Sequence, residues 1–92
     1  MFFKKNSEQF DEGYRAAETC MCSTIAQYGS VEGLYADEEL AAHISEYDPI
    51  SQKCAFRIFQ KRCSDPKRQF GLFWKGWEAY ILDWKRAVMV NW

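Results

Sequence analysis

The chain has 92 residues, of which 48% are hydrophobic and 27% are charged, and it contains only two prolines and five glycines. This composition excludes a disordered chain, and the length predicts a single domain whose small core buries roughly 60 to 65% of the unfolded surface. The formal net charge of -1 and the acidic pI near 5.8 argue against a dedicated nucleic-acid binder, because such proteins are usually basic.

Hydrophobic periodicity predicts an all-α fold, a compact bundle of about four helices with a long C-terminal helix, and no segment alternates as a strand does. The first helix ends at Gly29. A second helix is expected from about Asp37, whose carboxylate can cap it, to Tyr47. Residues 31–36, between these helices, have no clear pattern. The first helix has apolar side chains at steps of three and four residues: Phe10, Tyr14, Ala17, Met21, Ile25 and Tyr28.

Two Asp-Pro pairs, at residues 48–49 and 65–66, divide the second half of the chain. They predict a third helix from about Ile50 to Cys63, capped by Asp48, and a fourth from about residue 66 to Val90. The fourth helix contains six large aromatic side chains within residues 70–84. On a helical wheel its main apolar residues span about 140°, the width of a core-facing stripe. They are Phe70, Phe73, Trp74, Trp77, Tyr80, Ile81, Trp84 and Val88.

Leu72, Leu82 and Met89 lie outside this arc, interleaved with charged residues. Such apolar side chains need a second partner, either another helix of the same chain or a foreign surface. We predict that they form an apolar partner-binding face. Gly71 and Gly76 each weaken a helix by about 1 kcal/mol relative to Ala, so we expect another backbone or ring to approach them closely.

A basic stripe is predicted on the third helix. Lys53, Arg57 and Lys61 recur every four residues on about 80° of one face, and Lys67 and Arg68 extend the stripe past the second Asp-Pro pair. We expect the three helical cations to project away from the apolar side, toward an acidic protein surface or a nucleic-acid backbone. The alternative is an ordinary solvated face. The apolar residues assigned to the opposite side are Cys54, Phe56, Ile58, Phe59 and Cys63.

Charge is distributed unevenly along the chain. Residues 31–48 hold six acidic side chains and no Lys or Arg, whereas nine Lys or Arg and three acidic residues follow from residue 49 onward. The molecule is therefore expected to be a dipole, and the simplest interpretation is that the acidic and basic elements pack near each other.

Neither a metal site nor a catalytic site is predicted. Cys20 and Cys22 are two residues apart in a helix, so their side chains point about 200° apart and cannot both ligate one ion. Cys54 and Cys63 are interpreted as small core residues. His43, the only histidine, has no nucleophile with a motif around it. We expect no metal, no cofactor and no enzyme activity.

The start of the chain, Met-Phe-Phe-Lys-Lys, is followed by polar residues and by no apolar signal segment. We therefore expect a cytoplasmic protein with reduced thiols, in the host cytoplasm if a phage encodes it. The longest uncharged run, residues 19–31, contains Ser, Thr, Gln and Gly, so no membrane span or membrane partner is expected.

Two short blocks carry a family resemblance. Residues 10–17 (FDEGYRAA) and 73–80 (FWKGWEAY) resemble the Gly-Tyr-x-Ala and Trp-x-x-Gly-Trp-x-x-Ala elements of the ribosome modulation factor family, with Phe73 in place of Trp and Tyr80 in place of Ala. Cys63 with the following Asp-Pro is similar to that family's Cys-Pro turn. The resemblance covers about twenty residues and implies a compact helical fold that binds ribosomal RNA, although those proteins are strongly basic and this chain is not.

These features predict a non-enzymatic binding protein of the phage or mobile-element type. It is expected to block a large host complex, such as a nucleic-acid-processing defence complex, by protein–protein contact, as an anti-CRISPR protein does. The alternative is a ribosome- or RNA-binding modulation protein. Direct contact with nucleic acid is thus the second choice for the partner.

Overall fold

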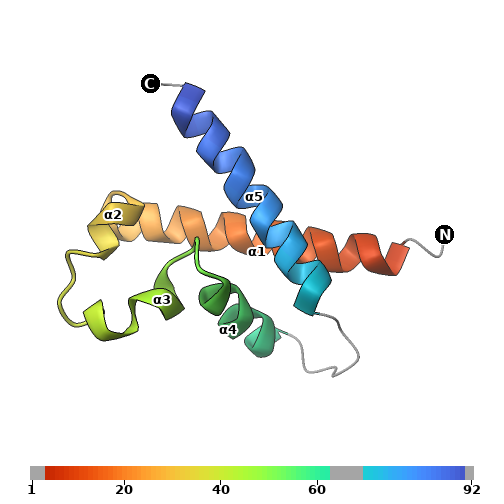
Figure 1. The fold of residues 1–92 in the computed structure, drawn as a ribbon, viewed down its shortest axis with the longest axis horizontal. Coiled ribbons are helices and arrows are strands. Elements are labelled where there is room, and N and C mark those ends of the chain that lie inside the picture. The colour runs from red at the N-terminus through yellow and green to blue at the C-terminus, as the bar shows by residue number, and fades with distance from the viewer. Residues whose placement is uncertain (1–3, 63–69, 91–92) are drawn as a thin grey trace.

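The computed structural model describes residues 4–62 and 70–90, and the side chains of residues 8–62 and 70–88. These residues contain no strand, so the predicted all-α class and the long C-terminal helix are confirmed. Figure 1 shows α5 crossing α1 obliquely, with α3 and α4 together on one side of α1. The elements are α1 (Lys4–Tyr28), α2 (Val31–Leu34), the 3-10 helix η1 (Ala41–His43), α3 (Ile44–Tyr47), α4 (Gln52–Arg62) and α5 (Phe70–Val90).

The first helix ends where the sequence predicts. Gly29 adopts a φ of 82°, which favours glycine, and its N–H donates to the carbonyl of Ile25 at 2.8 Å. Ala17 and Met21 of the predicted stripe are fully buried, but Phe10 and Ile25 are exposed. The polar side chain of Thr24 is buried, which is tolerated because its hydroxyl donates a hydrogen bond to the Cys20 carbonyl at 2.9 Å.

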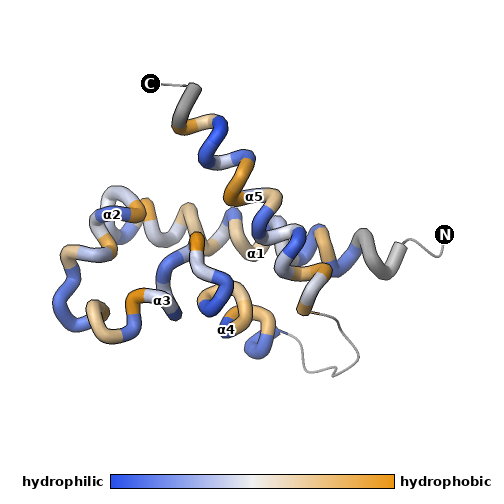
Figure 2. The backbone as a smooth tube through the Cα atoms, in the orientation of Figure 1, coloured by the Kyte–Doolittle hydropathy of each residue, from blue (hydrophilic) through white to orange (hydrophobic). Residues whose placement is uncertain are grey.

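The predicted second helix is wrong as a single element. Asp37 accepts a hydrogen bond from the Glu39 N–H at 3.0 Å, but the chain continues through turns, η1 and α3. Residues 31–48 contain no Lys or Arg, so no ion pair four residues apart can stabilise a longer helix there. Figure 2 shows this mainly hydrophilic segment between α2 and α3.

The cap of α4 also differs from the prediction. Asp48 accepts from the Ile50 N–H at 2.9 Å and so shapes the turn before the helix. The helix itself is capped by Ser51, whose hydroxyl accepts from the Lys53 N–H at 3.1 Å. The predicted bounds of α4 are otherwise close to those observed. Residues 63–69, where the fourth helix was expected to begin, lie outside the described residues.

Two glycines bring the backbones of α1 and α5 into contact. A Cβ atom on Gly13 would lie 1.9 Å from the Phe73 carbonyl oxygen, and one on Gly76 would lie 1.9 Å from the Phe10 carbonyl oxygen. The arrangement is reciprocal, since each phenylalanine precedes its helix's glycine by three residues. The prediction of a close approach is confirmed at Gly76 and wrong at Gly71, where an added Cβ atom would meet no atom of another described element within 4 Å.

The core lies beside this crossing. Trp77 is 0% exposed and Phe73 1%, and the predicted aromatic stripe of α5 is confirmed as the main apolar contributor. The indole Nε1 of Trp77 donates to the buried carbonyl of Pro49 at 2.6 Å, which holds the start of α4 against α5. The buried cluster joins α1, α2, α4 and α5: Ala16, Ala17, Met21, Val31, Cys54, Ala55, Phe73, Trp77 and Ile81.

The glycine crossing gives a first prediction. Gly13→Ala or Gly76→Ala should destabilise the fold by about 1 to 3 kcal/mol or more, because the new methyl group overlaps a backbone carbonyl that cannot rotate away. Gly71→Ala is the matched control, and it should be neutral or stabilising by up to about 1 kcal/mol. Urea unfolding followed by circular dichroism measures all three. Equal effects at Gly71 and Gly76 would contradict the close crossing.

The buried indole gives a second prediction. Trp77→Ala should cost about 3 to 5 kcal/mol through lost burial and a cavity, enough to unfold a domain of this size. Trp77→Phe keeps an aromatic ring but leaves the buried Pro49 carbonyl without its donor, at a cost of about 1 to 3 kcal/mol. Trp74→Phe, at a half-buried site, should cost less. Parent-like unfolding of Trp77→Phe would rule out a structural role for the hydrogen bond.

Candidate binding surface on helix α4

Helix α4 has one buried and one exposed face. Cys54 and Ala55 are both 0% exposed, and the Trp77–Pro49 hydrogen bond holds the preceding turn in place. This anchoring leaves the other side of the helix in solvent. The exposed residues of α4 are Gln52, Lys53, Phe56, Gln60, Lys61 and Arg62.

The predicted basic stripe is present only in part. Lys53 and Lys61 are exposed, as expected. Arg57 is half-buried: its Nε donates to the Glu46 carbonyl at 2.9 Å, and its guanidinium carbon lies 5.0 Å from the centroid of the Tyr47 ring. Arg57 therefore ties α4 to α3 by a hydrogen bond and a cation–π contact, instead of projecting freely into solvent. The acidic segment thus packs against the basic helix.

An exposed aromatic side chain accompanies the stripe. Phe56, predicted to face the apolar side, is 43% exposed and lines a shallow groove of about 260 Å³ with Glu46, Lys53, Arg57 and Gln60. The ring is supported from behind by Phe70, in an edge-to-face contact with centroids 5.0 Å apart. The sequence could have shown that Phe56 lies on the polar side of the helix, because it follows Lys53 by three residues and precedes Gln60 by four.

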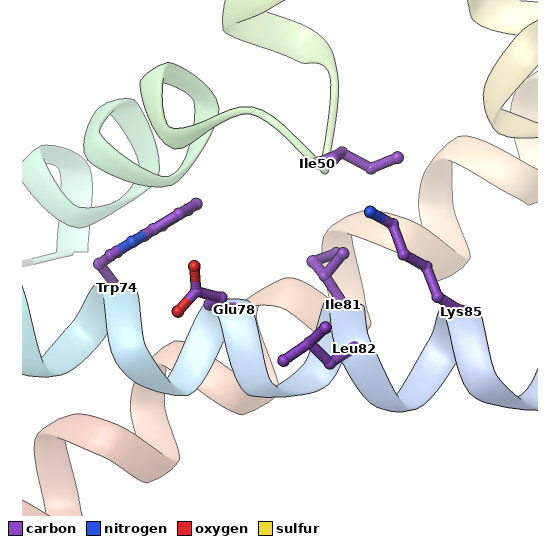
Figure 3. A pocket seen from close by; sticks show the side chains of 6 residues that line it. All are labelled: Ile50, Trp74, Glu78, Ile81, Leu82 and Lys85. Carbon is purple, nitrogen blue, oxygen red and sulfur yellow. The ribbon is translucent and has the colours of Figure 1, made fainter.

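The predicted apolar second face is not one face in the described residues. Leu72 is half-buried and shares its side of α5 with Gly76, which contacts α1. Leu82 is 48% exposed and lies elsewhere, in a groove of about 160 Å³ between α5 and Ile50. Figure 3 shows Trp74, Glu78 and Lys85 around the same groove. The side chain of Met89 lies outside the described residues, as do Lys67 and Arg68 of the stripe.

The structure brings no metal-ligand cluster together in the part of the chain that it describes: no three His, Cys, Asp or Glu side chains lie close enough to hold an ion. Cys20 is half-buried and Cys22 exposed, so the predicted divergence of these two side chains is confirmed. His43 is exposed in η1.

A comparison with protein-family models, curated proteins and solved structures found no match. Among the described helices, none is both long and apolar enough to cross a membrane. The candidate site is therefore defined by its own geometry, and we call it the α4 surface: Lys53, Phe56, Gln60 and Lys61, with Arg57 beneath them.

The different environments of the two cations give a third prediction. Arg57→Ala should destabilise the fold by about 1 kcal/mol, because a hydrogen bond from a charged group and its ring contact are lost at a half-buried site. Lys53→Ala, four residues away and exposed, should change the free energy of unfolding by less than about 0.5 kcal/mol. Thermal unfolding of both variants tests this prediction. Equal unfolding midpoints would indicate that Arg57 projects freely into solvent as Lys53 does.

Proposed function

We propose that this chain is a non-enzymatic binding protein that docks through the α4 surface onto an acidic region of a larger protein assembly. The observation that carries the proposal is the exposed Phe56 ring beside Lys53 on a helix whose opposite face is buried. A rigidly supported aromatic side chain supplies the apolar anchor of an interface, and the cations around it select an acidic partner.

Two features favour a protein partner over a nucleic acid. Glu46 lines the same groove as Phe56, so the groove carries both signs of charge, which a protein surface of mixed charge can complement and a uniformly anionic phosphate backbone cannot. Arg57, the central cation of the stripe, already contacts α3. We expect a small chain whose sequence carries no recognised catalytic motif to act by occupying its partner's surface. We therefore propose an inhibitor of the phage or mobile-element type that blocks a host complex, for example a nucleic-acid-processing defence complex.

The second candidate is a ribosome- or RNA-binding modulation protein. One observation favours it: residues 10–17 and 73–80, which carry the resemblance to the ribosome modulation factor family, contain the two glycines at which α1 and α5 cross. Shared residues at a fold-determining contact are what a common ancestry leaves behind. In this case Lys53, Lys61 and Arg62 provide phosphate contacts.

The proposal is tested with a charge-reversed α4 surface. Two variants should each lower partner capture from a bacterial lysate at least about tenfold. Lys53→Glu with Lys61→Glu removes the electrostatic attraction to an acidic partner, and Phe56→Ala removes the apolar anchor. Lys75→Glu with Arg86→Glu makes the same charge change at exposed sites of α5 and should capture as the parent does. Circular dichroism confirms that each variant is folded.

Nuclease and salt distinguish the two candidates. Capture through a protein surface survives nuclease treatment and weakens only moderately as the salt concentration rises. Binding to RNA is lost with nuclease, and its affinity falls steeply with salt because counterions are released from the phosphates. Undiminished capture by the α4 variants would refute the proposed surface for either partner.

A further inference from the structure

Two cysteines that are 34 positions apart in the chain meet between α1 and α4. The Sγ atoms of Cys20 and Cys54 lie 3.9 Å apart, and both thiols are free. Cys20 is half-buried, whereas Cys54 is 0% exposed and lies in the core. A reagent from solvent therefore reaches Cys20 first, with Cys54 directly behind it.

A cleft gives access to this pair. Cys20 lines an open cavity of about 320 Å³ between α1 and α4, a volume at the lower end of the range for small-molecule sites. Ala16 and Ile58 provide apolar walls, and the cations Lys61 and Arg62 stand at the same cleft. This lining suits a small molecule with a compact apolar or sulfur-containing middle and carboxylates at its ends.

The two thiols have opposite tendencies to ionise. The hydrogen bond with Cys54 lowers the pKa of Cys20, and the positive charge of Arg57 lowers it further against the effect of burial. The same hydrogen bond, together with burial, raises the pKa of Cys54. Cys20 is thus the thiol better able to act as a nucleophile, and Cys54 retains its proton until a later step.

We propose that Cys20 and Cys54 form a thiol–disulfide exchange site for a small anionic disulfide of the glutathione class. The Cys20 thiol loses its proton to water, and the thiolate attacks one sulfur of glutathione disulfide. The S–S bond of glutathione disulfide breaks, and the departing glutathione thiolate takes a proton from water. Cys54 then loses its proton to water, and its sulfur attacks Sγ of Cys20. The second glutathione leaves as a thiolate and is protonated, so two protein thiols are oxidised and one disulfide is reduced to two thiols.

The product would link α1 covalently to α4. The sulfurs must close from 3.9 Å to the bond length of about 2.05 Å, which requires side-chain rotation and a shift of the helices. Closing a loop of this length restricts the unfolded chain, so the thermal midpoint should rise by roughly 15 °C or more. The cleft shares Lys61 with the α4 surface, but thiol–disulfide exchange and partner capture are measured separately, so either proposal can fail alone.

The test uses the full chain with Cys22→Ser and Cys63→Ser, which leaves only the proposed pair. This variant is equilibrated with reduced and oxidised glutathione at varied ratios and analysed by intact mass and peptide mapping. The expected product has lost two hydrogen masses and contains a Cys20–Cys54 peptide, with the higher thermal midpoint. A stable glutathione adduct on Cys20, or no change at oxidising ratios, would overturn the proposal.

Single changes in the same background separate the two steps. Cys54→Ser or Cys54→Ala should stop at one glutathione adduct on Cys20, whereas Cys20→Ser should leave Cys54 unmodified because it is buried. Circular dichroism verifies the fold, and the alanine variant serves if serine is not tolerated in the core. Equal reactivity of Cys54 in the absence of Cys20 contradicts the assigned order.

The cations at the cleft test the class of substrate. Lys61→Gln with Arg62→Gln should slow the reaction with glutathione disulfide by about tenfold, because attraction of its carboxylates is lost. The rate with the neutral hydroxyethyl disulfide should stay the same. Lys75→Gln with Arg86→Gln makes the same charge change at exposed sites of α5 outside the cleft lining, and this variant should react as the parent does. Equal slowing with both disulfides would refute recognition of an anion.

Discussion

The close crossing of α1 and α5 is the constraint on which the rest of the structure depends. Gly13 and Gly76 leave no room for a Cβ atom, so the two backbones touch and each helix takes its position from the other. The contact is steric, and it places the aromatic stripe of α5 beside α1. With this geometry Trp77 reaches the centre of the core, where it is fully buried. A wider crossing would separate the helices that enclose this ring.

Trp77 then transmits the crossing to α4. Its indole N–H donates to the Pro49 carbonyl, and Pro49 lies in the turn that leads to the Ser51 cap of α4. The rotation of α4 about its own axis follows from this anchor, since Cys54 and Ala55 must face the core. The outer face of the helix is then left to solvent. One hydrogen bond thus connects a fully buried side chain to the helix that carries the exposed α4 surface.

Helix α4 carries both proposals on different sides. Its outer side presents Lys53 and Phe56, which suit a protein partner, and its inner side sets Cys54 against Cys20 of α1. A disulfide there would join the helix that presents the α4 surface to α1. Arg57 belongs to both environments, because its side chain contacts α3 and its charge lowers the pKa of Cys20.

Features that depend on local periodicity could be predicted from the sequence alone: the all-α class, the end of α1 at Gly29, the core-facing stripe of α5 and the divergence of Cys20 from Cys22. The end of α1 follows from the positive φ that glycine tolerates, and the other three follow from the rotation of a helix by a fixed angle per residue. Features that depend on which helices meet, and at what angle, could not be predicted from the sequence alone. Gly76 and Gly71 look alike in sequence, yet only Gly76 contacts another backbone. The anchored Arg57, the exposed Phe56 and the meeting of Cys20 with Cys54 were decided by tertiary packing, because contacts between distant residues depend on the positions of whole helices.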